Sequence, residues 1–195
     1  MSSLDKFFEG NRRFIETDFS RDPNHYAGLA DKQTPTALFI GCADSRVDPE
    51  RVCGARMGEI FVHRNIGNIV PEDDPNLATV LEYAVDHLGV EDVVVYGHSH
   101  CGAMAALDAG EGGEYIPGWL AHAREARDAA DAQGYSATTP EEKVRRLRFI
   151  EQENVRRQID HLRSYRFVSE AEKEGRITLS GLYYDIETGQ LERLC

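Results

Sequence analysis

The sequence predicts an α/β fold, with a mainly parallel β-sheet flanked by helices in a single domain. Three short apolar runs, at 36–40, 59–63 and 92–97, have the length and composition of strands. A longer segment at 74–89, between the second and third runs, has the apolar spacing of a helix. Because strands that alternate with helices pair in parallel through right-handed crossovers, these runs indicate a sheet covered by helices.

The first twenty residues are predicted to form an amphipathic helix. Their apolar side chains recur near helical spacing, at Leu4, Phe7, Phe8, Phe14, Ile15 and Phe19. Such an aromatic stripe needs another surface to cover it. We expect residues 1–34 to form a helical arm and residues 35–195 to form the α/β core with C-terminal helices and strands. The whole chain, 1–195, is expected to be one domain.

The remaining elements of the first half follow from local patterns. The run at 36–40 is apolar throughout and is followed by a glycine, which predicts a strand buried on both faces. The run at 59–63 resembles it. The helix at 74–89 begins at an Asp-Pro pair, carries Leu and Val on one face and ends at a glycine. The run at 92–97 is the clearest strand of the chain.

The second half is predicted to be helical first and extended afterwards. Residues 117–163 are mostly helical in pattern and rich in charge, with a loop near 134–136. Residues 176–180 and 181–185 have the composition of extended segments, and 187–190 has that of a turn.

The acidic composition argues against two classes of partner. The chain has 34 acidic and 22 basic residues, and its formal net charge of -12 repels phosphate backbones and anionic membranes. We therefore expect neither a nucleic acid nor a membrane as partner. The N-terminus lacks the apolar core of a secretion signal, and no run is long and apolar enough for a membrane span. The expected location is the cytoplasm.

Cysteine and histidine residues follow two of the predicted strands. The four cysteines of the chain are too few and too scattered for a disulfide framework. Cys42 comes directly after the first strand, and His98 and Cys101 come after the third. If these strands are near neighbours, the three side chains converge at one edge of the sheet. Two thiolates and one imidazole suit Zn²⁺ and leave a fourth position open for water. Alternatively, both cysteines are small buried apolar residues.

An acidic and a basic side chain lie two residues apart in the loop after the first strand. Asp44 and Arg46 can pair, and this pairing would orient the carboxylate and keep it ionised beside a metal. The alternative is a salt bridge that only stabilises the loop.

Taken together, these segments resemble the β-class carbonic anhydrases. Residues 42–47 and 97–102 are similar to the two signature segments of that family. The resemblance extends over nearly the whole chain, through segments 58–65, 82–85, 151–155 and 181–185. It implies a homodimer as the smallest unit, in which the N-terminal helix packs on the partner subunit, and a homotetramer is equally compatible.

The resemblance also implies roles for individual residues. Cys42, His98 and Cys101 would be the ligands of Zn²⁺. Asp44 and Arg46 would form the catalytic dyad, with Asp44 as a fourth zinc ligand in an inactive state. The backbone N–H of Gly102 would hold a substrate oxygen. Phe61 and Tyr83 would line an apolar substrate cleft, often across a dimer interface, although both can also be ordinary core aromatics.

The implied reaction is the reversible hydration of carbon dioxide to bicarbonate and a proton, with zinc-bound hydroxide as the nucleophile. One alternative is hydrolysis of carbonyl sulfide or carbon disulfide, which are linear and electrophilic at carbon, as CO2 is. Another is a non-catalytic, zinc-stabilised assembly module with Asp44 as a permanent ligand. Arg46 argues against that reading, because a structural site gains nothing from a cation that competes for its ligand.

Overall fold

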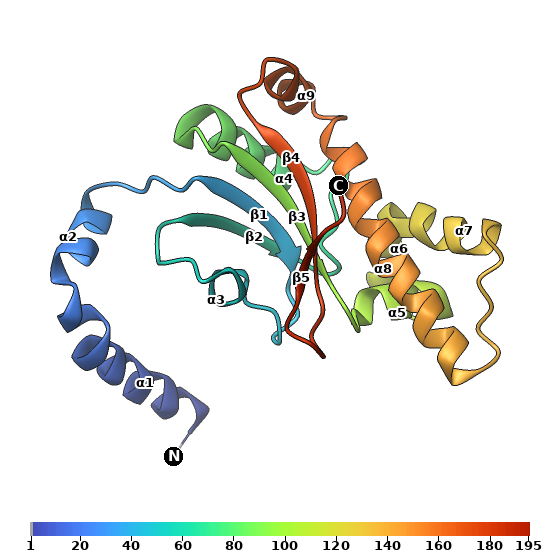
Figure 1. The fold of residues 1–195 in the computed structure, drawn as a ribbon, viewed down its shortest axis with the longest axis horizontal. Helices are drawn as coiled ribbons and strands as arrows, with labels where there is room; N and C mark the ends of the chain where they lie inside the picture. The colour runs from blue at the N-terminus through green and yellow to red at the C-terminus, as the bar shows by residue number, and fades with distance from the viewer. Residues whose placement is uncertain (1) are drawn as a thin grey trace. The chain divides into compact units, whose positions relative to one another are not determined.

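The computed structural model describes residues 2–195 of the chain. Their packing divides them into two compact units, one ending at Thr34 and the other spanning Pro35–Cys195. Figure 1 labels the elements of both units. Each unit is built from elements whose boundaries follow from the local sequence.

The N-terminal unit consists of two helices joined by a short 3-10 turn. Its elements are α1 (Ser3–Thr17), η1 (Phe19–Arg21) and α2 (Pro23–Asp31). Ser2 and Asp5 cap α1 reciprocally, each side chain accepting the other's backbone N–H. The predicted helix is therefore present, but it ends at Thr17. The rings of Phe14, Phe19 and Tyr26 pack against one another and hold the two helices of this unit together.

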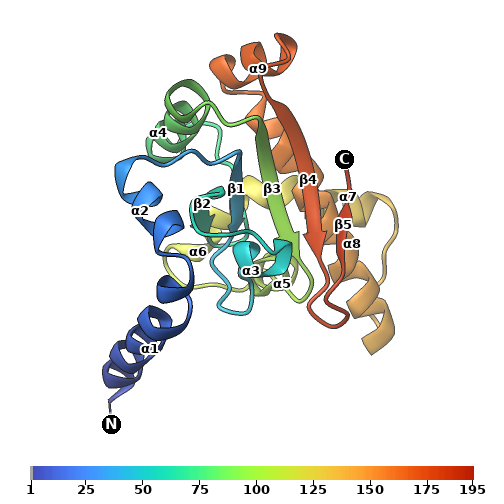
Figure 2. The ribbon, with the colours of Figure 1, turned by 60° about the vertical axis from the view of Figure 1, so that its left-hand side comes forward.

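The second unit is built on a five-stranded sheet with the order β2-β1-β3-β4-β5. The strands are β1 (Ala37–Cys42), β2 (Ile60–Asn65), β3 (Asp92–His98), β4 (Thr178–Tyr184) and β5 (Leu191–Arg193). The first four in this order pair in parallel, and β5 pairs with β4 antiparallel. Figures 1 and 2 show the sheet in two views that differ by a rotation of 60°. The predicted α/β class with a mainly parallel sheet is confirmed.

Helices follow most of the strands. They are α3 (Pro49–Cys53), α4 (Pro75–Glu82), the π-helix η2 (Tyr83–Leu88), α5 (Gly102–Ala109), α6 (Ile116–Leu120), η3 (Ala121–Ala123), α7 (Arg124–Ala132), α8 (Pro140–Leu162) and α9 (Arg166–Lys173). Among residues 2–195, no helix has the length and apolarity that crossing a membrane requires.

The two faces of β1 are buried by different partners. Leu38 and Ile40 join β3 side chains and residues of α4, α8 and α9 in the largest apolar cluster. Phe39 points to the other face, where it packs with Tyr96 and Val47. All three β1 side chains are buried, which confirms the prediction for the run at 36–40.

Three predicted elements differ from those observed. The run at 59–63 was expected to resemble the first strand, but β2 lies at the edge of the sheet and its side chains are mostly half-buried. The two extended runs at 176–180 and 181–185 form the single strand β4. The predicted helix at 74–89 changes from α to π geometry at Tyr83 and ends at Gly89, whose φ of 68° is accessible to glycine.

Helix α8 approaches the sheet where β3 and β4 carry glycine. A Cβ built on Gly97 would lie 2.4 Å from Val155 Cγ2, and one built on Gly181 would lie 2.8 Å from Val155 Cγ1. Only glycine leaves room for this valine between the two strands. The close approach fixes α8 beside the end of β3, and the next residue of that strand is His98.

Replacing Gly97 by alanine is expected to destabilise the fold. The added methyl group overlaps a buried β-branched side chain that cannot rotate away, so we expect the free energy of unfolding to fall by about 1–3 kcal/mol. Chemical denaturation measures this change. Gly118→Ala is the control, because a Cβ at Gly118 meets no atom within 4 Å. Equal stability of both variants would contradict the packing described.

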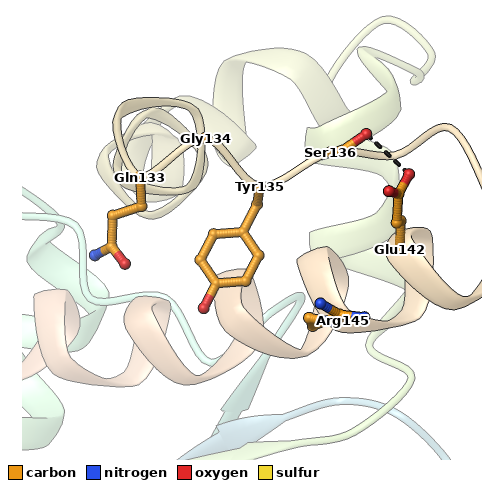
Figure 3. A pocket seen from close by; sticks show the side chains of 6 residues that line it. All are labelled: Gln133, Gly134, Tyr135, Ser136, Glu142 and Arg145. Carbon is orange, nitrogen blue, oxygen red and sulfur yellow. Dashed lines mark hydrogen bonds between the residues drawn. The ribbon is translucent and has the colours of Figure 1, made fainter.

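A polar hollow lies where α7 joins α8, and it has a volume of about 350 Å³. Figure 3 shows the side chains that line it, among them Tyr135, Arg145 and Glu142. The Ser136 hydroxyl donates a hydrogen bond to the Glu142 carboxylate. The same carboxylate accepts hydrogen bonds from the Thr138 hydroxyl and the Thr139 N–H, which completes the N-terminal cap of α8. The predicted loop near 134–136 is confirmed. The hydrogen bonds of Glu142 cap the N-terminus of α8, which follows this loop.

Glu142→Gln is expected to weaken the dependence of stability on acid pH. Hydrogen bonds from Thr138, Ser136 and Thr139 lower the pKa of Glu142 from 4.5 to about 2. Between these values the unfolded chain binds the proton more readily, so the wild-type protein loses stability as pH falls through this window. The glutamine variant should have a lower Tm at about pH 5.5, and its further loss on going to about pH 3.5 should be smaller than that of the wild type. Glu141→Gln is the control, and an unchanged acid dependence in Glu142→Gln would refute the explanation.

Candidate active site

The carboxyl ends of β1 and β3 bring three predicted ligands together. Because these strands are neighbours in the sheet, Cys42 at the end of β1 lies beside His98 at the end of β3. Cys101 follows as the N-terminal boundary residue of α5. One ligand atom from each residue lies within 4.8 Å of the others, and all three side chains are buried. The convergence predicted from the sequence is confirmed.

The hydrogen bonds of His98 leave one ring nitrogen without a partner. Its Nδ1 lies 2.8 Å from the carbonyl oxygen of Ser99, and a carbonyl oxygen can only accept, so Nδ1 carries the proton. Nε2 is therefore unprotonated in the neutral ring. It is buried, and none of residues 2–195 forms a hydrogen bond with it. A buried lone pair of this kind is costly unless another group binds to it.

The two cysteines shift each other's pKa in opposite directions. A hydrogen bond between them lowers the pKa of Cys42 to about 4 and raises that of Cys101. The backbone N–H of Gly67 also donates to Cys42 Sγ, at 3.4 Å. These contacts favour the thiolate form of Cys42, the form in which cysteine binds metals.

Asp44 and Arg46 form a bidentate pair beside this cluster. Arg46 donates to Asp44 Oδ1 from its backbone N–H at 2.9 Å and from Nε at 3.0 Å, and to Oδ2 from Nη2 at 2.7 Å. These bonds hold the pKa of the Asp44 carboxyl well below its usual range. Asp44 Oδ2 lies 4.0 Å from His98 Nε2. An ionised carboxylate thus stands at the edge of the cluster.

The backbone of the loop that follows β3 fixes the position of Arg46. Its Nη2 also donates to the carbonyl oxygen of His100, at 3.0 Å. His100 has a φ of 57°, an uncommon left-handed conformation for a residue with a Cβ. Its ring nitrogen Nε2 forms a hydrogen bond with Glu187 Oε1 at 3.0 Å. The guanidinium group therefore links the loops that follow β1 and β3.

Arg64 is a positioning residue that the sequence patterns alone did not assign to this loop. From the end of β2 it donates to the carbonyl oxygens of Cys42, Asp44 and Val47, at 2.9, 2.6 and 2.7 Å. It thereby fixes the backbone that carries Cys42 and Asp44. The sequence signal for this role was the position of Arg64 near the end of β2, the strand that pairs with β1.

The predicted substrate-binding residues lie in two places. Gly102 begins α5 directly after Cys101, and it is exposed. Phe61 and Tyr83 pack together with ring centroids 5.9 Å apart. Phe61 pairs with Leu38, four residues before Cys42, which places it about 13 Å along the strand from the cluster of the same chain. The structure therefore does not bring Phe61 and Tyr83 to this cluster, whereas Gly102 adjoins it.

Comparisons with known proteins identify relatives that are similar in sequence and in fold. The sequence profile of the carbonic anhydrase family matches residues 37–191. A carbonic anhydrase of Pseudomonas aeruginosa is 40% identical over 192 residues, which cover 95% of this chain and 85% of that protein.

Solved structures agree with this match. One of two tetrameric β-carbonic anhydrases from Sordaria macrospora superimposes with a TM-score of 0.90 at 32% identity, covering 98% of this chain and 96% of the other. A Coccomyxa β-carbonic anhydrase, solved in complex with acetazolamide, gives a TM-score of 0.89 at 30% identity, covering 100% and 87%.

Proposed function

Because this chain belongs to the β-class carbonic anhydrase family, we propose that it catalyses the reversible hydration of CO2 to bicarbonate and a proton with Zn²⁺ as cofactor. The observation that carries the proposal is the buried cluster of Cys42, His98 and Cys101 beside an ionised Asp44. The cluster supplies metal ligands, and the carboxylate supplies a hydrogen-bond acceptor where a nucleophile would lie.

The residues present fit a zinc ion. Among residues 2–195, the buried lone pair of His98 Nε2 has no hydrogen-bond partner, and the lowered pKa of Cys42 favours negative charge beside it; both features favour a bound cation. Two sulfurs and one imidazole nitrogen form a ligand set typical of catalytic zinc. When bound, zinc lowers the pKa of a coordinated water towards neutrality, as is established for carbonic anhydrases.

Asp44 and Arg46 are proposed to orient the nucleophile. Arg46 keeps Asp44 ionised, so that a carboxylate oxygen can accept a hydrogen bond from water at the cluster. The contact between Arg46 and the His100 carbonyl oxygen resists rotation of this pair. A state in which Asp44 is a fourth metal ligand would require these bonds to break, and we propose that such a state is inactive.

The substrate is proposed to lie beside the first turn of α5. Gly102 carries no side chain there, and its backbone N–H belongs to the N-terminal turn of a helix, where an oxygen with partial negative charge is stabilised. Because Phe61 and Tyr83 lie away from the cluster of their own chain, we propose that they line the cleft of a neighbouring subunit. Tyr83 is 42% exposed, so its ring is available for such a contact.

A homo-oligomer, a dimer or a tetramer, is the proposed assembly. Phe7 and Phe8 of α1 are 72% and 63% exposed, as expected of a helix that packs on a partner subunit. The tetrameric assembly of the Sordaria relatives supports a homo-oligomer. The arm 1–34 and the core 35–195 would then form one domain in each subunit. A cytoplasmic location belongs to the same proposal. Neither a nucleic acid nor a membrane is a proposed partner, given the net charge of -12.

Stopped-flow measurement of CO2 hydration by the zinc-loaded protein tests the proposal. Rapid hydration that disappears after chelation and returns with zinc is the expected result. A protein that retains zinc and stays slow from neutral to alkaline pH would refute CO2 hydration, and carbonyl sulfide would be the next substrate to test.

A further inference from the structure

A buried carboxylate contacts the backbone of the third proposed ligand. Glu151 lies on α8 and is only 3% exposed. Its Oε1 accepts a hydrogen bond from the backbone N–H of Cys101 at 2.8 Å. Cys101 is the N-cap residue of α5, a position whose backbone N–H has no acceptor within its own helix, and this N–H donates to α8 instead. The contact fixes the backbone from which the Cys101 sulfur projects.

The second oxygen of the same carboxylate is held from β4. Tyr183, which is 2% exposed, donates its hydroxyl proton to Glu151 Oε2 at 2.6 Å. Arg148 donates to the Tyr183 hydroxyl oxygen at 3.2 Å and pairs with Asp185 at 3.1 Å. Tyr183 of β4 therefore holds Oε2, and this contact restricts rotation of the carboxylate away from Cys101.

Packing alone does not explain an acidic residue at this position. On α8, Glu151 shares one face with Val155 and Ile159, both of which are buried in the main apolar cluster. Burial raises the pKa of Glu151, against the opposing effect of its hydrogen bonds to Tyr183 and Cys101. An apolar residue would fill the same place without desolvating a carboxyl group. Its distinctive contact is the one with Cys101.

We infer that Glu151, oriented by Tyr183, is a positioning residue that holds Cys101 in the conformation required for metal binding. The inference rests on the proposed function, since it takes Cys101 as a zinc ligand. Loss of the Glu151 acceptor would free the Cys101 backbone and leave its N–H unpaired. The sulfur would then lie less often within reach of Cys42 and His98, and zinc would bind more weakly.

Zinc affinity and the cobalt spectrum test this inference without reference to activity. The zinc Kd is measured by competition with a chromophoric chelator, and the thiolate-to-cobalt absorption of the Co²⁺-loaded protein reports the cysteine ligands. Glu151→Leu removes the acceptor, and its Kd is expected to rise by about 10- to 100-fold with altered cobalt bands. Glu151→Gln keeps an acceptor oxygen, so its Kd should lie between that of the leucine variant and that of the wild type. Tyr183→Phe should also raise the Kd, because Oε2 loses its donor.

Glu153→Leu is the matched control on the same helix, since the Glu153 carboxylate pairs with Arg157 and is not bonded to Cys101. A Kd for Glu151→Leu equal to that of the control overturns the inference. If circular dichroism shows that Glu151→Leu does not fold, the zinc Kd of Tyr183→Phe tests the inference instead. A Kd equal to that of the wild type then overturns the inference. Wild-type protein that binds neither ion would refute the proposed metal site itself, which is a distinguishable failure.

Discussion

Replacing Cys101 by alanine is expected to remove both metal binding and CO2 hydration. Its sulfur is one of the three ligand atoms of the cluster, and Cys101 is 1% exposed, so alanine leaves an incomplete ligand set in a buried place. The metal and the acid–base chemistry that depends on it are lost together, so hydration should fall by at least about 10⁴-fold. Zinc content by mass spectrometry and stopped-flow hydration measure the two losses.

Cys53→Ala is the control for Cys101→Ala. Cys53 ends α3, and its thiol is exposed and free. This variant should keep its zinc and its rate. An alanine variant at Cys101 that retains stoichiometric zinc and rapid hydration would exclude Cys101 as a ligand, and with it the proposed Cys2His site.

Asp44→Asn is expected to separate catalysis from metal binding. Asparagine has nearly the same size, but its amide cannot supply a charged acceptor to the nucleophile, and its bonds to the Arg46 guanidinium are weaker. Hydration should fall by about 10²- to 10³-fold, a range typical for the loss of one general acid–base group. Zinc content should remain that of the wild type, because the three ligands are unchanged.

The neighbouring aspartate supplies the control for this second prediction. Asp48 is exposed, and its side chain accepts a hydrogen bond from the backbone N–H of Arg51 at the start of α3. Asp48→Asn should leave hydration nearly unchanged. If Asp44→Asn keeps full activity with zinc bound, Asp44 is not part of the catalytic machinery and its pairing with Arg46 only stabilises the loop.

The ligand cluster could be predicted because its residues directly follow strands that are easy to recognise. The apolar composition of 36–40 and 92–97 identified β1 and β3, and parallel pairing then placed Cys42 and His98 at one edge of the sheet. Local patterns could not show that these strands are immediate neighbours. That adjacency depends on the whole crossover through β2 and α4, whose packing is determined at the level of the tertiary structure.

Features that depend on long-range contacts were missed. The run at 59–63 has the composition of a central strand, but nothing in it indicates that β2 has a neighbour on one side only within residues 2–195. The role of Glu151 was also missed, because its partners Cys101 and Tyr183 come from distant segments. An acidic residue at helical spacing from the apolar Val155 and Ile159 was the available signal.

The adjacency of β1 and β3 also has a consequence for how the protein matures. Cys42 emerges from the ribosome long before His98, and the two meet only when the parallel pairing across the crossover is complete. The nascent chain therefore has no assembled ligand set that could nucleate folding around an ion. At the proposed site, zinc would bind only after the slow, non-local step of sheet formation, and it would stabilise the folded chain rather than speed its folding.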